Sequence, residues 1–151
     1  MKKKGYWFFG LSGSGKTLAT SYLKKKIKNS VVIDGDQIRK YVSYDLGYKL
    51  KDREIQISRV LGFAKISIKS SIVPIISTVY MNKKILKKAK QLGIKMFKVE
   101  RNMSNVFRHH PTYKNNKKNI VGKDIFFENF KSKVIKNNIK LDFFKSLNKI
   151  L

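Results

Sequence analysis

One stretch near the start of the chain constrains the fold more than any other. It reads Gly10-Leu11-Ser12-Gly13-Ser14-Gly15-Lys16-Thr17, and it follows the apolar run 6–9 and precedes a helix-forming segment. Its glycines let the backbone curl so that successive N–H groups point at a phosphate chain, and the helix N-terminus adds partial positive charge. The order of strand, glycine-rich loop and helix therefore predicts a phosphate-binding loop, or P-loop.

Two side chains of this loop have expected roles. Lys16 is placed to reach the β- and γ-phosphates of ATP, and the Thr17 hydroxyl is placed to hold Mg²⁺. We therefore expect ATP and Mg²⁺ as cofactors, residues 10–17 as their binding site, and a Lys16 that faces solvent before the nucleotide binds. A glycine-rich turn that matches the motif by chance is the alternative, but all four fixed positions are filled and the strand and helix are in place.

The formal net charge of +26 has two interpretations. A protein with such a charge attracts polyanions, among them nucleic acid, anionic membrane and nucleotide substrates. Alternatively the charge reflects coding bias, because Lys, Asn and Ile, whose codons are rich in A and T, are all enriched and the lysines are spread along the chain. We favour the second interpretation, in which lysine pairs such as Lys117-Lys118 are solvated and no nucleic acid is bound specifically.

The length of 151 residues fits one domain, residues 1–151. The absence of cysteine excludes disulfides, thiolate nucleophiles and zinc-thiolate sites. The apolar runs are too short to cross a bilayer, and Met1-Lys2-Lys3-Lys4 leads into the first strand rather than into a signal-peptide core. We therefore expect a cytoplasmic protein with no membrane partner.

Short buried strands and amphipathic helices alternate along the chain. Strands are expected at 6–9, 31–33, 71–79, 94–99 and 134–135, and helices at 16–28, from 37, at 52–70, at 83–92 and at 142–151. We expect 71–79 to be the central strand, despite Pro74, and Leu18 to face the core from the first helix. The alternation predicts an α/β fold, a P-loop NTPase-type three-layer sandwich with a parallel sheet of about five strands and helices on both faces.

The segment 109–124 interrupts this pattern. It is dense in Lys and Asn with almost no core residues, and this composition predicts a mobile lid. Phe126, Phe127 and Phe130 are expected to resume the packing after it. The pair His109-His110 lacks spaced carboxylates or cysteines, so we interpret these histidines as lid residues rather than metal ligands.

Two carboxylates, Asp34 and Asp36, follow the expected strand 31–33. Open α/β sheets place their ligands at the carboxyl ends of strands. Phosphoryl transfer needs a carboxylate that positions or deprotonates the attacking hydroxyl, and Asp36 is our candidate, with Lys16 as the second catalytic residue. Asp34 is expected to support Mg²⁺ or to orient the loop. The alternative for the pair is a capped turn that begins a helix.

These motifs resemble those of the adenylylsulfate (APS) kinases over nearly the full chain. The resemblance is carried by residues 7–17, then Asp34-Gly35-Asp36-Gln37-Ile38-Arg39, Asp45-Leu46-Gly47-Tyr48 and Asp52-Arg53-Glu54, in that order. It implies transfer of the ATP γ-phosphoryl group to the 3′-hydroxyl of a nucleotide, with a homodimer as an open question. It places Arg108 near the ATP adenine, and it implies the substrate-binding set Asp34, Arg39, Tyr48, Arg53, Gln56, Ser77, Lys114 and Ile120.

The chain departs from typical APS kinases in the acceptor half of the site. Gln56 stands where those enzymes have asparagine, Thr78 where they have an aromatic residue, and Tyr80-Met81 where they have serine-proline. The lid is shorter, and Ile120 stands where a phenylalanine stacks on the APS adenine. We therefore expect an intact ATP site beside an altered acceptor site.

Three functions fit these observations. The first is an APS kinase, which converts APS to PAPS. The second is the same reaction on another nucleotide, such as the cytidine diphosphoramidate phosphorylated by relatives in capsule biosynthesis. The third, a basic nucleic-acid-binding protein on a degenerate kinase fold, would have no reason to keep Lys16, Thr17 and Asp36 together.

Overall fold

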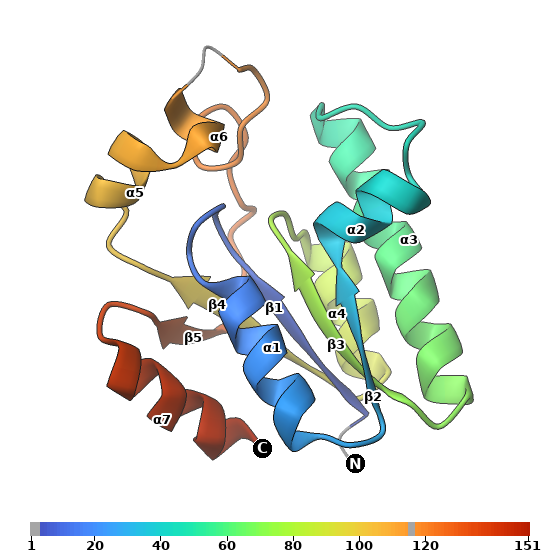
Figure 1. Ribbon diagram of the computed structural model, residues 1–151. Coiled ribbons are helices and arrows are strands. Elements are labelled where there is room, and N and C mark those ends of the chain that lie inside the picture. The colour runs from blue at the N-terminus through green and yellow to red at the C-terminus, as the bar shows by residue number, and fades with distance from the viewer. Residues whose placement is uncertain (1–3, 115–116) are drawn as a thin grey trace.

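The computed structural model describes residues 4–114 and 117–151 as a parallel five-stranded sheet covered by helices on both faces (Figure 1). The start of the chain at 1–3 and two residues of the expected lid, 115–116, lie outside the described residues. The strands are β1 (Gly5–Phe9), β2 (Ser30–Asp34), β3 (Val73–Thr78), β4 (Ile94–Glu100) and β5 (Lys133–Lys136), in the order β2-β3-β1-β4-β5. This confirms the predicted α/β fold class.

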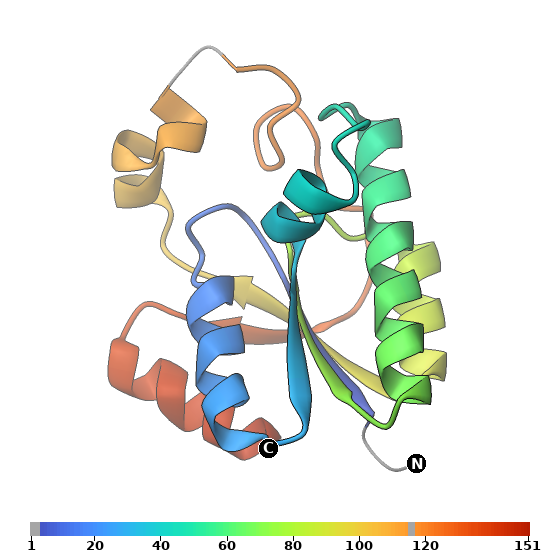
Figure 2. The same cartoon turned by 45° about the vertical axis from the view of Figure 1, so that its right-hand side comes forward.

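Two layers of helices enclose the sheet. The helices are α1 (Lys16–Lys26), α2 (Gly35–Tyr41), α3 (Leu50–Lys69), α4 (Lys83–Gln91), α5 (Ser104–His109), α6 (Pro111–Lys114) and α7 (Lys140–Ile150). Figure 2 shows α1 and α7 against one face and α3 and α4 against the other, while α2, α5 and α6 lie at the end where the strands finish. Among the described residues, no helix has the length and apolar character needed to cross a membrane.

The middle strand of the sheet is β1, which pairs with β3 on one side and β4 on the other. The expectation that residues 71–79 form the central strand is therefore wrong by one position. Tyr6 and Phe8 join the core under α1 and α7, whereas Trp7 and Phe9 join the core under α3 and α4. A strand buried on both faces reads as a continuous apolar run, which explains its sequence.

Pro74 is accommodated inside the sheet by a glycine on the next strand. A Cβ atom on Gly5 would lie 2.7 Å from the Pro74 Cγ, so the pyrrolidine ring fills the space that a side chain at position 5 would need. Proline removes one ladder hydrogen bond and is uncommon in a sheet interior. The pairing of β1 with β3 nevertheless runs in regular register from Tyr6 to Phe9.

Three packing expectations need correction. Leu18 is 39% exposed, because α1 instead buries the stripe of Lys16, Ala19, Thr20 and Leu23. Phe126 is 68% exposed, whereas Phe127 and Phe130 pack on Phe9 as expected. The lid, expected to hold almost no core residues, contributes two adjacent ones, since Ile120 and Val121 are both buried.

Candidate active site

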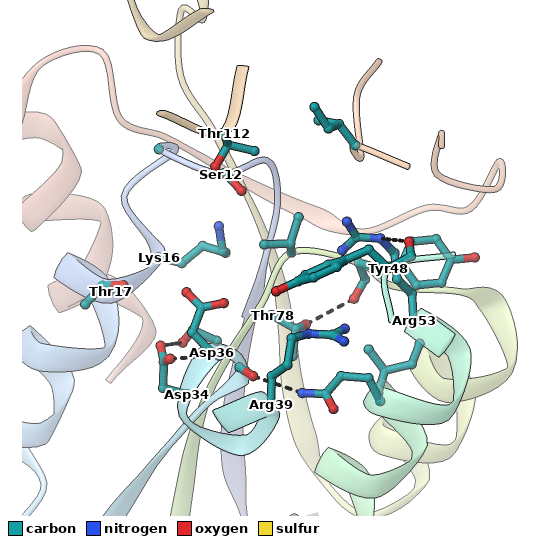
Figure 3. Close-up of a pocket in the computed structure, with 18 of the residues that line it drawn as sticks. Ser12, Lys16, Thr17, Asp34, Asp36, Arg39, Tyr48, Arg53, Thr78 and Thr112 are labelled. Atoms are coloured by element: carbon teal, nitrogen blue, oxygen red, sulfur yellow. Dashed lines mark hydrogen bonds between the residues drawn. The ribbon is translucent and has the colours of Figure 1, made fainter. Parts of the chain in front are cut away.

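A cavity of about 720 Å³ opens at the carboxyl ends of the strands, between the P-loop, α2 and the loop that leads into α3 (Figure 3). Of the residues expected from the sequence, it is lined by Ser12, Gly13, Gly15, Lys16, Thr17, Asp34, Asp36, Arg39, Tyr48, Arg53, Gln56, Ser77 and Ile120. The fold therefore brings the P-loop residues and the expected substrate-binding residues together around one cavity.

Five expected site residues do not line this cavity. Gly10, Leu11 and Ser14 belong to the loop but are not part of the cavity lining, while Arg108 on α5 and Lys114 on α6 are exposed. Other lining residues were not expected to do so. Of these, His110, Thr112, Lys117 and Lys118 come from the lid region, and Val79 follows β3. Thr78 and Tyr80 also line the cavity, and they are two of the positions at which the sequence departs from typical APS kinases. Nothing in the sequence pattern marked Thr112 as a site residue.

The glycines of the loop stand where other residues would not fit. Gly13 and Gly15 have φ angles of +83° and +107°, in the region that only glycine adopts readily. A Cβ on Gly13 would lie 2.6 Å from the Val106 Cγ1, and a Cβ on Gly15 would collide with the Asn137 amide. These contacts explain why the P-loop needs its glycines even before a nucleotide is considered.

The Lys16 side chain forms a hydrogen bond within the P-loop. Its Nζ donates a 2.8 Å hydrogen bond to the Leu11 carbonyl oxygen, and the residue is only 9% exposed. The expectation that this lysine faces solvent is therefore wrong. Burial lowers its pKa to about 8, although the nearby Asp36 and Asp34 charges act in the opposite direction. The ammonium group is thus held where it meets a bound anion, in a place where its charge is poorly solvated.

Asp34 caps α2, so the alternative interpretation of the carboxylate pair is confirmed for this residue. Its Oδ1 accepts hydrogen bonds from the backbone N–H groups of Asp36 at 3.0 Å and Gln37 at 3.2 Å. Its Oδ2 accepts a 2.7 Å hydrogen bond from the Ser77 hydroxyl, which joins α2 to the end of β3. Both oxygens of Asp34 are thereby engaged in orienting the first turn of α2.

The Asp36 carboxylate, in contrast, accepts no hydrogen bond from the residues that the structure describes. It lies in the first turn of α2, lines the cavity and is close enough to Lys16 to affect the pKa of the lysine (Figure 3). A carboxylate that faces a cavity with free lone pairs is able to accept a proton or a hydrogen bond from a ligand hydroxyl.

Gln56 supports this turn from α3. Its Nε2 donates a 2.9 Å hydrogen bond to the carbonyl oxygen of Gly35, the residue between the two aspartates. Its Oε1 is buried without a hydrogen-bond partner among the described residues, at the wall of the cavity. A buried amide oxygen without a partner is costly, so a ligand that donates to it would be favoured there.

Two arginines lie close to the ring of Tyr48. The guanidinium carbon of Arg39 lies 4.6 Å from the ring centroid and that of Arg53 lies 5.6 Å from it. Arg39 also donates to the Gly47 carbonyl at 2.6 Å. Burial, and then the charge of Arg39, lower the pKa of Arg53 from its usual value. Two neighbouring cations, neither of which forms a salt bridge with a described residue, favour an anionic ligand.

Arg53 further ties this region to the lid. It donates from Nε to the Tyr48 carbonyl at 3.1 Å and from Nη2 to the Asn119 carbonyl at 2.8 Å. The next residue, Ile120, is 4% exposed, and its N–H donates to Asp124 Oδ2 at 2.9 Å. The aliphatic side chain at position 120 is therefore held at the edge of the cavity by a compact turn.

The fold and the loop define a P-loop NTPase-type α/β protein with a nucleotide-sized cavity at the carboxyl edge of its sheet. The chain belongs to the adenylylsulphate kinase family, whose sequence model matches residues 3–132. This confirms the resemblance inferred from the motifs.

Individual relatives are similar over part of their length. The chain is 41% identical over 81 residues to an adenylyl-sulfate kinase of Clostridium acetobutylicum, a match that covers 50% of this chain and 40% of the relative. It is 34% identical over 107 residues to that of Buchnera aphidicola, covering 64% of this chain and 52% of the relative. The matches thus span about half or less of these curated relatives.

A solved structure extends the likeness to the whole fold. The APS kinase CysC of Mycobacterium tuberculosis, in complex with AMPPNP and APS, superposes with a TM-score of 0.81 over 98% of this chain and 95% of its own. The identity of 20% makes this a statement about the fold alone.

Proposed function

We propose that this protein is an ATP-dependent kinase that transfers the γ-phosphoryl group to the 3′-hydroxyl of a nucleotide, with APS as acceptor and PAPS as product. One observation carries the proposal: Asp36, free of hydrogen bonds from the described residues, shares a cavity with the P-loop lysine and with Tyr48, which lies close to two arginines. A donor site and an acceptor site therefore meet at one carboxylate.

The P-loop half is suited to ATP. The amide groups of the loop and the N-terminus of α1 face the position of the phosphates, and Lys16 supplies a positive charge to the β- and γ-phosphates. The described residues contain no group of three His, Cys, Asp or Glu side chains that could hold a metal by themselves. Mg²⁺ would be held by the Thr17 hydroxyl beside the bound phosphates, and it would neutralise phosphate charge there.

Asp36 is the proposed base. The capping contacts of Asp34 and the hydrogen bond from Gln56 to the Gly35 carbonyl fix the first turn of α2, so the Asp36 carboxylate is held in place. It then orients the attacking 3′-hydroxyl and accepts its proton as the oxygen bonds to the γ-phosphorus of ATP, while the bond from that phosphorus to the bridging oxygen breaks and ADP leaves. Asp34 acts through this positioning, because both of its oxygens are already occupied.

Arg39, Arg53 and Tyr48 form the proposed acceptor half. The planar guanidinium groups suit sulfate or phosphate oxygens, and the Tyr48 ring, 56% exposed, offers a face for a base. Ser77 and Gln56 complete the wall of this half. Arg108 and Lys114, which lie outside the cavity, keep their predicted contacts to the ATP adenine and to the substrate only if α5 and α6 change position on binding.

A second acceptor is favoured by one residue. Ile120, at the edge of the cavity, supplies no aromatic ring opposite Tyr48. A smaller pyrimidine loses less than a purine when one of two stacking rings is missing, so cytidine diphosphoramidate is the alternative acceptor.

The proposal is tested by ADP formation from ATP and Mg²⁺ with a panel of acceptors. We expect the release of ADP to depend on added APS. The rate of ADP release with cytidine diphosphoramidate, compared with the rate with APS, ranks the two acceptors. ATP hydrolysis that is unaffected by any nucleotide acceptor would contradict the kinase assignment.

A further inference from the structure

The outward carbonyl groups of the P-loop are held by side chains from segments far away in the sequence. The Tyr113 hydroxyl of α6 donates to the Ser12 carbonyl oxygen at 3.1 Å. The Asn137 Nδ2, just after β5, donates to the Ser14 carbonyl oxygen at 2.9 Å. Arg101, just after β4, makes a longer contact of 3.4 Å from Nη1 to the Gly13 carbonyl oxygen. Three consecutive carbonyl groups thus have donors that the P-loop motif itself does not contain.

Peptide geometry links these contacts to the phosphate site. All peptide bonds within the described ranges, 4–114 and 117–151, are trans. In a trans peptide the C=O of one residue points opposite to the N–H of the following residue. Because Tyr113 holds the Ser12 carbonyl oxygen, the Gly13 N–H points away from Tyr113. Because Asn137 holds the Ser14 carbonyl oxygen, the Gly15 N–H points away from Asn137. Gly13 and Gly15 both line the cavity.

The Gly13 and Gly15 N–H groups form no hydrogen bond with another described residue. The Ser14 N–H, in contrast, donates to the Leu11 carbonyl oxygen at 3.1 Å and so belongs to the turn. Unpaired N–H groups aimed at one cavity are what binds phosphate oxygens in such a loop.

Both donors are themselves fixed. The Asn137 N–H donates to the Glu100 carbonyl oxygen at 2.7 Å, which continues the pairing of β4 with β5, and its amide fills the space beside Gly15. The Tyr113 ring packs edge-on against Phe107, with ring centroids 4.9 Å apart, and also meets His110. The donors are thus anchored to the sheet and to the α5–α6 segment, not to the P-loop.

We propose that Asn137 and Tyr113 are positioning residues that keep the Gly13 and Gly15 amides aimed at the nucleotide phosphates before ATP arrives. This inference rests on the proposed function for its choice of ligand. The two residues touch neither the acceptor half nor Asp36, so their effect falls on the affinity for phosphate chains and not on the acceptor.

The test compares single-group deletions with matched controls. Asn137→Ala and Tyr113→Phe each remove one donor to a P-loop carbonyl. Asn29→Ala removes an equivalent amide donor, which bonds to the Ser71 carbonyl at 2.7 Å, and Tyr22→Phe removes a hydroxyl that bonds to Asn148 Oδ1 at 2.7 Å. Both controls break contacts between distant segments without touching the P-loop.

Calorimetry with inorganic tripolyphosphate and with ATP gives the readout. We expect each P-loop variant to bind both ligands about tenfold more weakly than the wild type, the scale of one lost hydrogen bond, while the controls bind as the wild type does. In the kinase assay the KM for ATP rises by a similar factor, whereas the KM for the acceptor is unchanged.

Tripolyphosphate binding keeps this test separate from the function. Unchanged affinity in Asn137→Ala and Tyr113→Phe, or an equal loss in the two controls, would overturn the positioning role even if the enzyme phosphorylates APS. A weaker affinity in these variants alone supports the role even if no acceptor is phosphorylated.

Discussion

The Lys16 ammonium group lies 2.8 Å from the Leu11 carbonyl oxygen, so the lysine of the P-loop is hydrogen-bonded within its own loop and buried. The loop therefore holds a cation in a poorly solvated place at the wall of the cavity. Burial lowers the pKa of this lysine to about 8, which makes its protonation sensitive to a bound anion.

ATP binding is expected to take up protons near pH 8. In the protein without nucleotide, Lys16 has a pKa of about 8 and is therefore about half protonated at pH 8. Phosphate charge raises this pKa, so ATP binding at pH 8 takes up about half a proton. Above this pH the affinity falls, to about one fifth at pH 9 of its value at pH 8. Calorimetry in buffers of different ionisation enthalpy measures the uptake. Binding without proton uptake at pH 8 would show that the lysine titrates elsewhere.

Replacement of the lysine should separate activity from stability. Lys16→Met removes the charge that acts on the phosphates, so we expect activity to fall on the order of a thousandfold. The folded state should be no less stable, because a buried ammonium that costs desolvation is replaced by an apolar chain of similar length. Steady-state kinetics at saturating ATP and thermal unfolding measure both, with the exposed Lys25→Met as control. A Lys16→Met variant that turns over as fast as the wild type would contradict the P-loop assignment.

Asp36→Asn tests the proposed base. The amide keeps the shape of the carboxylate but cannot accept the proton, so kcat should fall by about a hundredfold or more while both nucleotides still bind. Calorimetry and single-turnover kinetics separate the two effects. Asp142→Asn, at an exposed position on α7, is the control. A variant that loses ATP affinity and keeps kcat would place Asp36 in the Mg²⁺ shell.

The acceptor base is tested at position 120. Stacking on a second aromatic ring is worth roughly 1 to 3 kcal/mol per base, so a protein with Ile120 should bind APS about ten- to a hundredfold more weakly than one with phenylalanine. Ile120→Phe is expected to raise kcat/KM for APS more than for cytidine diphosphoramidate. Ile139→Phe adds the same ring at a residue that is 62% exposed and serves as control. A wild type that prefers APS and is harmed by Ile120→Phe would contradict this account of the lid.

The high positive charge should have little specific consequence. We expect only weak retention of RNA at about 0.15 M salt, because many dispersed lysines bind phosphates without selecting a sequence. Filter binding across a salt series measures the affinity and its slope. A tight complex with one RNA sequence or structure at that salt would favour a nucleic-acid function over coding bias.

Local patterns predicted the frame of the molecule. The strand, loop and helix around residues 5–26 follow from an apolar run, glycines and a helix-forming segment, each of which acts locally. The exposure of Leu18 could not be read in this way, because it depends on which face of α1 packs on the sheet, and the packed face carries Ala19 and Leu23. Periodicity alone does not show which side a polar residue takes.

The site was predicted where motifs are contiguous and missed where the fold brings single residues together. Asp34 and Asp36 were expected at a strand end, and the structure places them there. Asn137 lies 123 positions from the Ser14 carbonyl that it holds, and an asparagine in an Asn-rich chain gives no signal of such a contact. The long-range pairing of β4 with β5 is what creates it.

The most direct test of the central claim is the chemical identity of the product. Phosphorus NMR of a reaction containing ATP, Mg²⁺ and APS should show one ADP formed for each new phosphomonoester, with that phosphate coupled to the 3′ proton of the acceptor ribose. Asp36→Asn should leave the spectrum of the substrates almost unchanged over the same time. Inorganic phosphate in place of a 3′-phosphorylated nucleotide, with APS and with cytidine diphosphoramidate alike, would contradict the account.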